Sequence, residues 1–367
     1  MPEQRREGRA PILLDGGAST PPTYDIEEVI GYDALWESME KCRKGVAWKG
    51  SVQSFLLNAP AELLKLCDQL HDGTYQPREP KHFTVTYPKR REIVGIAFRD
   101  RIVQRSYNDN VIYPCMSRSW IYDNYACQKG KGTDFARNRM RAHLERQARA
   151  SGPDFPVLVM DVKGYYDSLL YEVIGESFYA KCPRWAASFA CETIRRQYGY
   201  GDHGVNPGSQ LVQIAGVDYL SDVDHYVKEH LRVRGYGRYM DDLVLIHHDE
   251  GYLAECADMI ARRMSHVGLR PHPTKTRIVR STDGFRFLGF DWRVAPDGAV
   301  VMTLVTGNVK AMRRRISRLW GLERRGLRAA GTTDTAYMGW RAHACKGNGW
   351  HVLERNDNWY LNLTDRT

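Results

Sequence analysis

Residues 236–249 read YGRYMDDLVLIHHD and place two adjacent carboxylates, Asp241 and Asp242, between two short apolar runs. Like charges at this spacing repel each other, so the pair belongs either in a solvated turn, where water screens it, or beside a cation. The flanking apolar runs predict a hairpin with the acidic pair at its turn. A third carboxylate, Asp161, ends the apolar run FPVLVM, which is typical of a buried strand. If the strands are neighbours in one sheet, the three carboxylates meet at its edge.

Three carboxylates at one sheet edge suit two divalent cations, because such ions prefer hard oxygen ligands. Two ions can activate a 3′-hydroxyl, bridge phosphates and stabilise a leaving pyrophosphate. Successive side chains of an extended segment face opposite ways, which favours Asp241 as the bridging ligand and leaves Asp242 peripheral or at the second metal. Each feature also has a simpler interpretation, since the pair alone fits a solvated turn and Asp161 alone fits a helix cap.

Composition is that of a folded protein with a modest excess of base. The 367 residues include 53 Lys and Arg against 44 Asp and Glu, a net charge of +9 that favours a polyanionic partner such as nucleic acid. The eight cysteines form no CxxC pair and no zinc-like spacing, which is typical of reduced cysteines. The N-terminus lacks the apolar core of a signal peptide, and no apolar run reaches membrane-spanning length. We therefore expect a cytoplasmic protein without a membrane partner.

Changes in composition along the chain predict four regions. Residues 1–24, rich in charge, Gly and Pro, are expected to be a mobile tail. Residues 25–150 contain amphipathic helices, a hairpin with a basic turn and a glycine-containing loop. Residues 151–304 contain the carboxylates, and residues 305–367 are expected to be helical. This last region begins with a basic helix over residues 308–325.

Seven segments of the chain occur in an order that is much more specific than any one of them. They are PKRREIVGIAFRDRIVQ, YACQKGKGTDFAR, VLVMDVKGYYDSL, GVNPGSQLVQ, YMDD, HPTKT and FRFLGF. On these segments the chain resembles bacterial reverse transcriptases over about residues 80–330. That class includes group II intron, retron, diversity-generating retroelement and phage-defence enzymes. The resemblance implies an α+β right-hand polymerase with fingers, a palm built on an antiparallel βαββ-type sheet, and a helical thumb.

The resemblance also implies a set of metal ligands and a proton donor. Asp161, Asp241 and Asp242 would hold two Mg²⁺ ions, for which Mn²⁺ can substitute. The backbone of Val162 would contact a metal and the phosphates of the nucleotide. Lys275, in HPTKT, matches the position from which a lysine could protonate the departing pyrophosphate, although its segment also fits a surface loop.

The nucleotide site is implied by three further positions. Tyr166 falls where the family places an aromatic steric gate, which would clash with a 2′-hydroxyl and favour deoxynucleotides. Spacing alone does not separate it from Tyr165, and either ring could instead pack the palm. Arg91 and Lys131 are matched to positions that hold the triphosphate, a task that suits their charge. Surface charge is the alternative for both, and four cations compete with them: Lys89, Arg90, Arg99 and Lys129.

The segment NPGSQLVQ resembles the motif that contacts the template. Ser209 can open a helix there. The chain departs from many relatives at Pro207 and Val212, so Gln210 and Gln213 are expected to share the contacts to the template and the nucleotide base.

Two later segments resemble parts that hold the primer and the duplex. The run FRFLGFDWRV predicts a short strand, in which Phe287, Leu288 and Gly289 match the primer grip. They are expected either to approach the primer end through the backbone or to form a core strand. Arg314 and Arg318, on the basic helix, would follow the phosphates of the template and primer duplex, so that binding weakens as salt rises.

These features predict an RNA-directed DNA polymerase, a nucleotidyltransferase that copies RNA into cDNA from dNTPs. The chain shows neither a second acidic cluster typical of ribonuclease H nor a Cys/His-rich nuclease segment, so we expect a stand-alone enzyme with a dedicated noncoding RNA encoded nearby. SQLVQ, YLSDVDHYVKE and YGRYMDD look closest to unassigned and defence-associated enzymes, which favours antiphage defence. The alternatives are a diversity-generating retroelement enzyme and a non-catalytic RNA-binding scaffold. The sequence leaves open the primer, a homo-oligomer and an accessory protein.

Overall fold

The computed structural model of the chain describes residues 24–85, 91–199 and 201–365. The mobile tail expected for residues 1–24 therefore lies outside the described residues, except for Tyr24. The same is true of the basic turn of the first hairpin, including Lys89 and Arg90. Among the described helices, none is both long and apolar enough to cross a membrane.

The central layer is a four-stranded antiparallel sheet that carries the acidic hairpin. Its strands follow the order β4-β5-β3-β6. Their bounds are β3 Pro156–Asp161, β4 Gly235–Tyr239, β5 Asp242–Ile246 and β6 Arg277–Arg280. The strand that ends in Asp161 thus lies between the acidic hairpin and β6, which brings Asp161 next to the turn of that hairpin.

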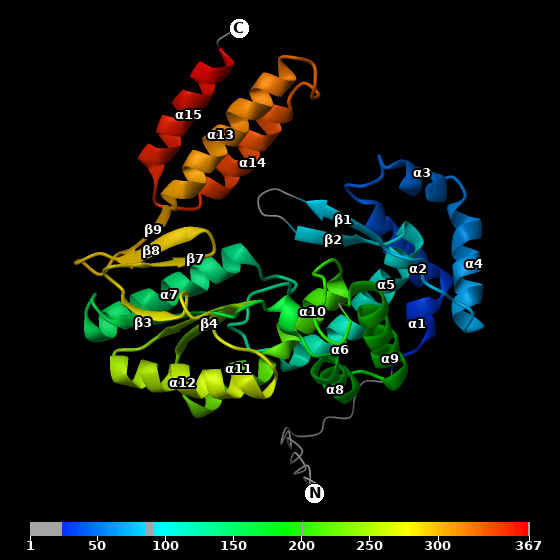
Figure 1. The fold of residues 1–367 in the computed structure, drawn as a ribbon, viewed down its shortest axis with the longest axis horizontal. Coiled ribbons are helices and arrows are strands. Elements are labelled where there is room, and N and C mark those ends of the chain that lie inside the picture. Colours follow the sequence, from blue (N-terminus) through cyan, green and yellow to red (C-terminus); the bar gives the residue numbers. More distant parts are fainter. Residues whose placement is uncertain (1–23, 86–90, 200, 366–367) are drawn as a thin grey trace, which may run out of the picture.

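Both faces of the central sheet are covered by helices (Figure 1). Side chains alternate along a strand. Accordingly, Leu158 and Leu245 pack in the core that includes α12 (Glu250–His266). Val157 and Val244 pack in the other core, which includes α7 (Thr133–Ser151). This two-sided burial accounts for the continuous apolar character of β3 and β5.

The fingers-side part of the chain consists mostly of helices around one hairpin. The hairpin pairs β1 (Lys81–Val85) with β2 (Arg91–Gly95). The preceding helices are α1 Glu27–Ile30, α2 Tyr32–Arg43, α3 Gly50–Leu56 and α4 Ala59–His71. The following segments are α5 Phe98–Tyr107, η1 Asn108–Ile112, α6 Tyr113–Met116 and η2 Ser117–Ser119. Between β3 and β4 lie η3 Tyr166–Ser168, α8 Tyr171–Lys181, α9 Arg184–Thr193, η4 Ile194–Tyr198, α10 Gln210–Tyr219, α11 Ser221–His225 and η5 Tyr226–His230.

A smaller antiparallel sheet packs on α7 and leads into the last helices. Its strands are β7 Phe285–Phe287, β8 Phe290–Val294 and β9 Val300–Leu304. The predicted strand FRFLGFDWRV is therefore divided by a turn at Leu288 and Gly289. Both turn residues have positive φ, of 50° and 81°, as in the two-residue turns that suit hairpins.

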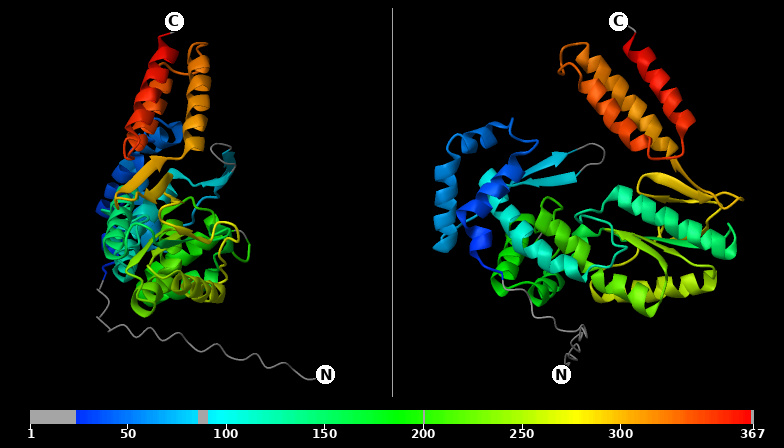
Figure 2. Two further views of the ribbon diagram at one scale, coloured as in Figure 1. Left: turned by 90° about the vertical axis from the view of Figure 1, so that its left-hand side faces the viewer. Right: turned by 180° about the vertical axis from the view of Figure 1, so that it is seen from behind.

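The C-terminal part is a bundle of three helices with a core of its own. The helices are α13 Thr306–Glu323, α14 Thr332–Ala344 and α15 Trp350–Thr364. Their core contains Met312, Ile316, Tyr337 and Tyr360, and the rings of the two tyrosines stack with centroids 4.0 Å apart. The bundle projects from the palm on the side of the β1–β2 hairpin, as the views from the side and from behind also show (Figures 1 and 2). The predicted α+β class with antiparallel sheets is confirmed.

Candidate active site

The register of the central sheet brings the three carboxylates together. Asp161, the last residue of β3, pairs directly with Asp242, the first residue of β5. Asp241 lies in the turn before it, and its main-chain carbonyl accepts a hydrogen bond of 3.2 Å from the N–H of Val162. The register thus places Asp242, rather than Asp241, directly opposite Asp161. The expectation that Asp241 is the bridging ligand stays a prediction.

The acidic turn has an unusual backbone conformation. The pairing of Tyr239 with Asp242 leaves only Met240 and Asp241 in the turn, and Met240 has a φ of 55°. Glycine adopts this left-handed conformation readily, whereas a methionine does so rarely. A conformation of this kind persists only where its surroundings hold it, and such residues are found preferentially at functional sites.

The electrostatics of the cluster favour a positive charge. Burial, together with the charges of Asp241 and Asp161, raises the pKa of Asp242 to about 7. Burial also raises the pKa of Asp241, with a further contribution from Asp161. The ammonium of Lys275 lies 2.8 Å from Oδ2 of Asp161, and this hydrogen bond raises the lysine pKa. A cation at this edge would relieve the repulsion among the three carboxylates.

The structure separates the two adjacent tyrosines that spacing could not distinguish. Tyr165 is buried, and its hydroxyl donates to the main-chain carbonyl of Gly216 on α10. Tyr166 is only half-buried, and its hydroxyl points to Sδ of Met240 in the acidic turn, at 3.8 Å. Tyr165 therefore packs the palm, whereas Tyr166 lies beside the acidic turn, and its role as the gate stays a prediction.

The two residues expected to hold the triphosphate differ in what surrounds them. Lys131 donates to the main-chain carbonyls of Tyr122 at 2.8 Å and Asn124 at 2.9 Å, and it reaches that of Ile121 at 3.4 Å. Its ammonium thus holds the loop, and contact with a phosphate would require these bonds to open. Arg91 begins β2, but its side chain lies outside what the structure describes.

The template-side segment forms the start of α10. The hydroxyl of Ser209 caps the helix by accepting the N–H of Val212 at 3.2 Å, as the sequence predicts. Gln210 is exposed and Gln213 is half-buried, whereas Val212 is fully buried in the palm core. Both glutamines are therefore accessible to a partner, and Val212 is not.

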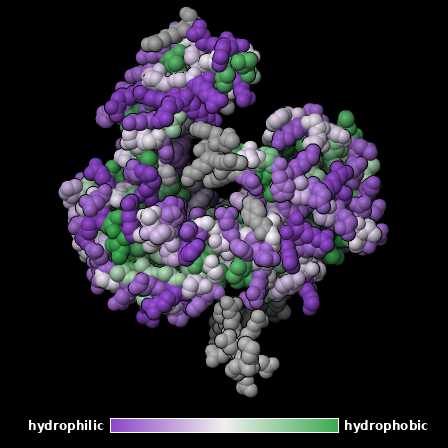
Figure 3. Space-filling view, viewed as in Figure 1, coloured by the Kyte–Doolittle hydropathy of each residue, from purple (hydrophilic) through white to green (hydrophobic). Residues whose placement is uncertain are grey.

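The segment matched to the primer grip lies next to the C-terminal helix bundle, and the basic helix is the first helix of that bundle, α13. Phe287 is buried, so this residue belongs to a core strand. The Leu288–Gly289 turn approaches α14 closely, since a Cβ on Gly289 would lie 3.5 Å from Nε2 of His343. Arg314 and Arg318 are exposed on α13, and the visible face of the bundle is largely hydrophilic (Figure 3).

A comparison with protein families identifies the family of the chain. Residues 86–292, which include all three carboxylates, match the model of the family "Reverse transcriptase (RNA-dependent DNA polymerase)". The chain belongs to the reverse transcriptase family. The matched residues carry the central sheet with its three carboxylates, and the right-hand fold with fingers, palm and thumb is that of this family.

Two solved structures give weaker likenesses to this reverse transcriptase. Apo telomerase from Candida tropicalis, truncated from its C-terminal domain, is 12% identical over 59% of this chain and 54% of its own, with a TM-score of 0.45. Apo telomerase from the same organism is 14% identical over 59% of this chain and 47% of its own, also with a TM-score of 0.45. This chain thus spans about half the length of the telomerases that it matches. No curated protein matches it.

Reverse transcriptases generally use divalent metal ions, and the donor set of this palm fits them. Within the described ranges, no three His, Cys, Asp or Glu side chains are already gathered closely enough to hold a metal ion. The three carboxylates nevertheless supply hard oxygen atoms, and burial together with the neighbouring carboxylates raises the pKa values of Asp241 and Asp242, which a cation would offset. The ammonium of Lys275 already forms an ion pair with Asp161. A metal bound at Asp161 would therefore share this carboxylate with Lys275.

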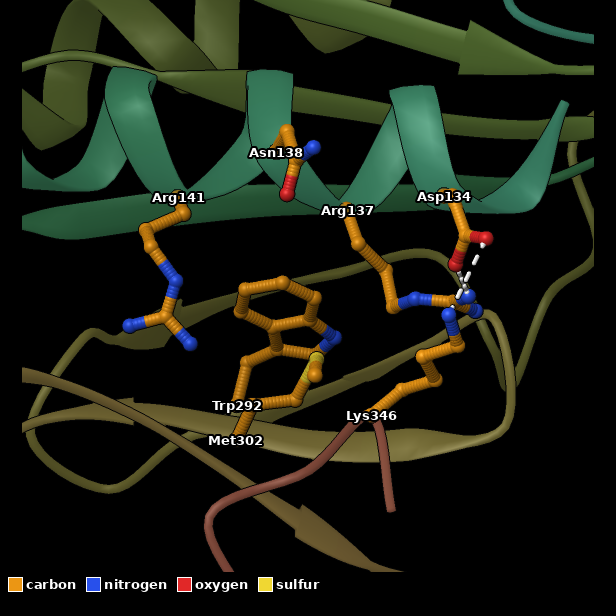
Figure 4. A pocket seen from close by; sticks show the side chains of 7 residues that line it. All are labelled: Asp134, Arg137, Asn138, Arg141, Trp292, Met302 and Lys346. Carbon is orange, nitrogen blue, oxygen red and sulfur yellow. Dashed lines mark hydrogen bonds and ion pairs between the residues drawn. The ribbon is translucent and has the colours of Figure 1, made fainter. Parts of the chain in front are cut away.

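A pocket elsewhere in the reverse transcriptase marks the junction between palm and thumb. It has a volume of about 310 Å³ and is lined by Trp292 and by residues of α7 and of the loop after α14 (Figure 4). Lys346, in that loop, lies 3.5 Å from Asp134 of α7. Arg141 of α7 donates to the carbonyl of Val300 at 2.8 Å. None of the three carboxylates lines this pocket. It lies between α7, Met302 of β9 and the α14–α15 loop.

Sequence reasoning missed one charged pair beneath the acidic turn. Arg238 and Asp224 are both completely buried, and they form a salt bridge of 2.7 Å. The signal in the sequence was the position of Arg238, which is two residues after Tyr236 and therefore on the same buried face of β4. A lone arginine in a strand is more often solvated, so only the fold shows that this one is internal.

Proposed function

We propose that Asp161, Asp241 and Asp242 hold two Mg²⁺ ions, for which Mn²⁺ can substitute, while the enzyme copies RNA into DNA. When bound, such ions activate the primer 3′-hydroxyl and neutralise charge on the phosphates. The observation that carries this proposal is the register that gathers the three carboxylates at one edge of the palm sheet. The N–H of Val162 is engaged by Asp241, so its carbonyl oxygen is the backbone group left for a metal and the nucleotide.

Two side chains of the palm complete the proposed chemistry. The ammonium of Lys275 lies 2.8 Å from Oδ2 of Asp161, so it is close enough to the proposed metals to deliver a proton to the departing pyrophosphate. Tyr166 lies next to Met240 of the acidic turn, so a sugar bound at the metals would meet its ring. A ring in this place would exclude a 2′-hydroxyl and select deoxynucleotides.

The remaining contacts of the substrates are proposed from the matched segments. Arg91 and Lys131 hold the triphosphate, with Lys131 released from its three carbonyls when a nucleotide binds. Gln210 and Gln213, near the start of α10, contact the template and the nucleotide base. The primer and duplex contacts come from five residues: Phe287, Leu288, Gly289, Arg314 and Arg318.

These assignments divide the chain into functional regions. The N-terminal helices and fingers would comprise residues 25–150, the palm with its primer grip residues 151–304, and the thumb residues 305–367. In support of the last boundary, strand β9 ends at Leu304 and helix α13 begins at Thr306.

We further propose that the enzyme is bacterial, acts in the cytoplasm, and protects its host from phage by making cDNA from a noncoding RNA encoded nearby. The support is the likeness of SQLVQ, YLSDVDHYVKE and YGRYMDD to unassigned and defence-associated enzymes. A diversity-generating retroelement is the second candidate, favoured by the finger loop YACQKGKGT and by GVNPGSQLVQ. Neighbouring genes distinguish the two, because only diversification requires an imperfect repeat in a nearby gene.

The test is a phage-plating assay with wild type, with Asp161→Asn, and with the neighbouring RNA deleted. Asparagine keeps the shape of the side chain but removes the charge that holds a hard cation. We expect protection to disappear in both altered strains although the protein accumulates, and sequencing of bound nucleic acid to recover cDNA only from wild type. Full protection by Asp161→Asn, with RNA but no cDNA bound, would instead support an RNA-binding scaffold.

A further inference from the structure

We propose that Arg238 is a positioning residue that holds the acidic turn in its active conformation through the main-chain carbonyl of Met240. It lies on β4, three residues before Asp241, and its side chain is completely buried. This inference rests on the proposed function of Asp241 and Asp242 as metal ligands. It concerns how these ligands are fixed in space before any metal binds.

The guanidinium of Arg238 joins three separate elements. Nη1 donates to the carbonyl of Met240 at 2.8 Å, and Nη2 donates to the carbonyl of Val217 on α10 at 2.7 Å. Nε and Nη2 each donate to one carboxylate oxygen of Asp224 on α11, both at 2.7 Å. Because the guanidinium is planar and rigid, its two bonds to Asp224 fix the direction in which Nη1 points.

The carboxylate of Asp224 is itself held in place, so the guanidinium of Arg238 that it binds cannot rotate. Its carboxylate also accepts the hydroxyl of Tyr236 at 2.5 Å and Nδ2 of Asn124 at 3.2 Å. Burial disfavours the charged form of Arg238, but the charge of Asp224 outweighs burial and raises the arginine pKa above its ordinary value. The ion pair therefore stays charged and satisfied inside the palm, as a buried pair must.

The turn needs such support because of its backbone. Met240 holds a φ of 55° without being glycine, a conformation that its surroundings must impose. One restraint comes from the residue after β3, since the N–H of Val162 donates to the carbonyl of Asp241 at 3.2 Å. The other is the bond from Arg238 to the preceding carbonyl. Together they fix the peptide groups on both sides of Asp241.

This geometry predicts a defined consequence for catalysis. Without Arg238, the turn can relax and the carboxylates of Asp241 and Asp242 shift relative to Asp161. A displacement of about 1 Å in a catalytic group costs about 10²-fold in rate. Since the residues that contact the nucleotide are unchanged, kcat should fall while KM for the dNTP stays close to wild type.

Two variants separate positioning from a merely structural role. In the double variant Arg238→Met with Asp224→Leu, apolar side chains replace the whole ion pair, so that neither charge is left buried alone, and the bond to Met240 is removed. The change costs some stability, because Tyr236 and Asn124 lose their acceptor. Arg238→Lys keeps the charge but loses the planar fork. Arg263→Lys is the matched control, because Arg263 donates to Asp222 of the same helix, α11, at 2.9 Å from a half-buried position on α12.

The readouts are steady-state kinetics of primer extension on an RNA template, thermal unfolding, RNA binding, and amide hydrogen exchange of the turn without metal. For the double variant we expect a lower unfolding temperature, wild-type RNA binding, about 10²-fold lower kcat, unchanged KM, and faster exchange at the turn. Arg238→Lys should show the same kinetic change, and it alone decides the question if the double variant does not fold. Arg263→Lys should behave as wild type.

A folded Arg238 variant with wild-type kcat and wild-type exchange at the turn would overturn the inference. Asp241→Asn is measured in parallel to distinguish this outcome from a failure of the proposed function. If Asp241→Asn is inactive while the Arg238 variants are active, only the positioning role is wrong. If Asp241→Asn keeps wild-type kcat, the assignment of the metal ligands is wrong instead.

Discussion

Replacement of Tyr166 by valine should weaken the selection of deoxynucleotides over ribonucleotides. The ring is wedged between two fixed elements of the palm. A Cβ on Gly216 of α10 would lie 3.1 Å from Cε1 of the ring, and the hydroxyl faces Met240 of the acidic turn. A ring confined in this way cannot move aside for a 2′-hydroxyl, whereas a valine would leave room for it.

The expected loss of sugar selection can be estimated from how strongly an apolar pocket excludes a hydroxyl. A close-packed apolar pocket rejects a substrate that carries one extra hydroxyl by about 10²-fold. We therefore expect wild type to prefer dCTP over CTP by at least about this factor in kcat/KM, and Tyr166→Val to lose most of that preference. The preference for the correct base should be unchanged, because the ring contacts the sugar.

Two conservative variants serve as controls for this measurement. Tyr166→Phe keeps the ring and loses only a weak interaction with a thioether, so its sugar selection should equal that of wild type. Tyr165→Phe loses the bond to the carbonyl of Gly216 and should be less stable by about 0.5–1.5 kcal/mol, with unchanged selection. Single-nucleotide extension on an RNA template measures both ratios. Equal selection by Tyr166→Val and wild type would refute the gate.

Three further predictions concern the proton donor, the thumb and the hairpin that bears the turn. Lys275→Gln should lower kcat by about 10²–10⁴-fold. The ion pair of Lys275 with Asp161 is half-exposed and should contribute at most about 1 kcal/mol to stability, so the variant should fold normally. An unchanged kcat would show that Lys275 forms only a surface ion pair and donates no proton. Arg314→Gln with Arg318→Gln should weaken the salt dependence of duplex binding. The slope of log binding constant against log salt concentration should fall by about 0.9 for each phosphate that the thumb no longer neutralises. An unaltered slope would show that these arginines of α13 do not contact the duplex. Gly237→Ala should lower the free energy of unfolding by about 1–3 kcal/mol, because the new Cβ would lie 2.6 Å from Cζ of buried Tyr125. Thermal denaturation measures this destabilisation, and wild-type stability would show that the tyrosine ring can move.

The arrangement of the carboxylates was accessible from sequence because it depends on local patterns. The apolar runs on either side of Asp241 and before Asp161 predict strands, and an acidic pair between two strands predicts a turn. The structure places these strands side by side in one sheet. Sequence could not supply the register, and the register is what sets Asp242 opposite Asp161.

Other features depend on interactions between segments far apart in the chain. The burial of Arg238 requires Asp224 and α10, which no local pattern reveals. The ammonium of Lys131 looked free in sequence, yet it binds main-chain carbonyls of its own loop. The strand β9, Val300–Leu304, was not foreseen, because its short apolar run follows a Pro- and Gly-containing turn and precedes a helix.

The central claim is tested most directly by primer extension on an RNA template with dNTPs and Mg²⁺, comparing wild type with the double variant Asp241→Ala and Asp242→Ala. Loss of two metal ligands removes the charge that the chemistry requires, whereas the thumb arginines are untouched. We expect Mg²⁺-dependent DNA synthesis by wild type, none by the variant, and equal binding of RNA by both. Substantial DNA synthesis by the double variant would contradict the assignment of the carboxylates as the catalytic centre.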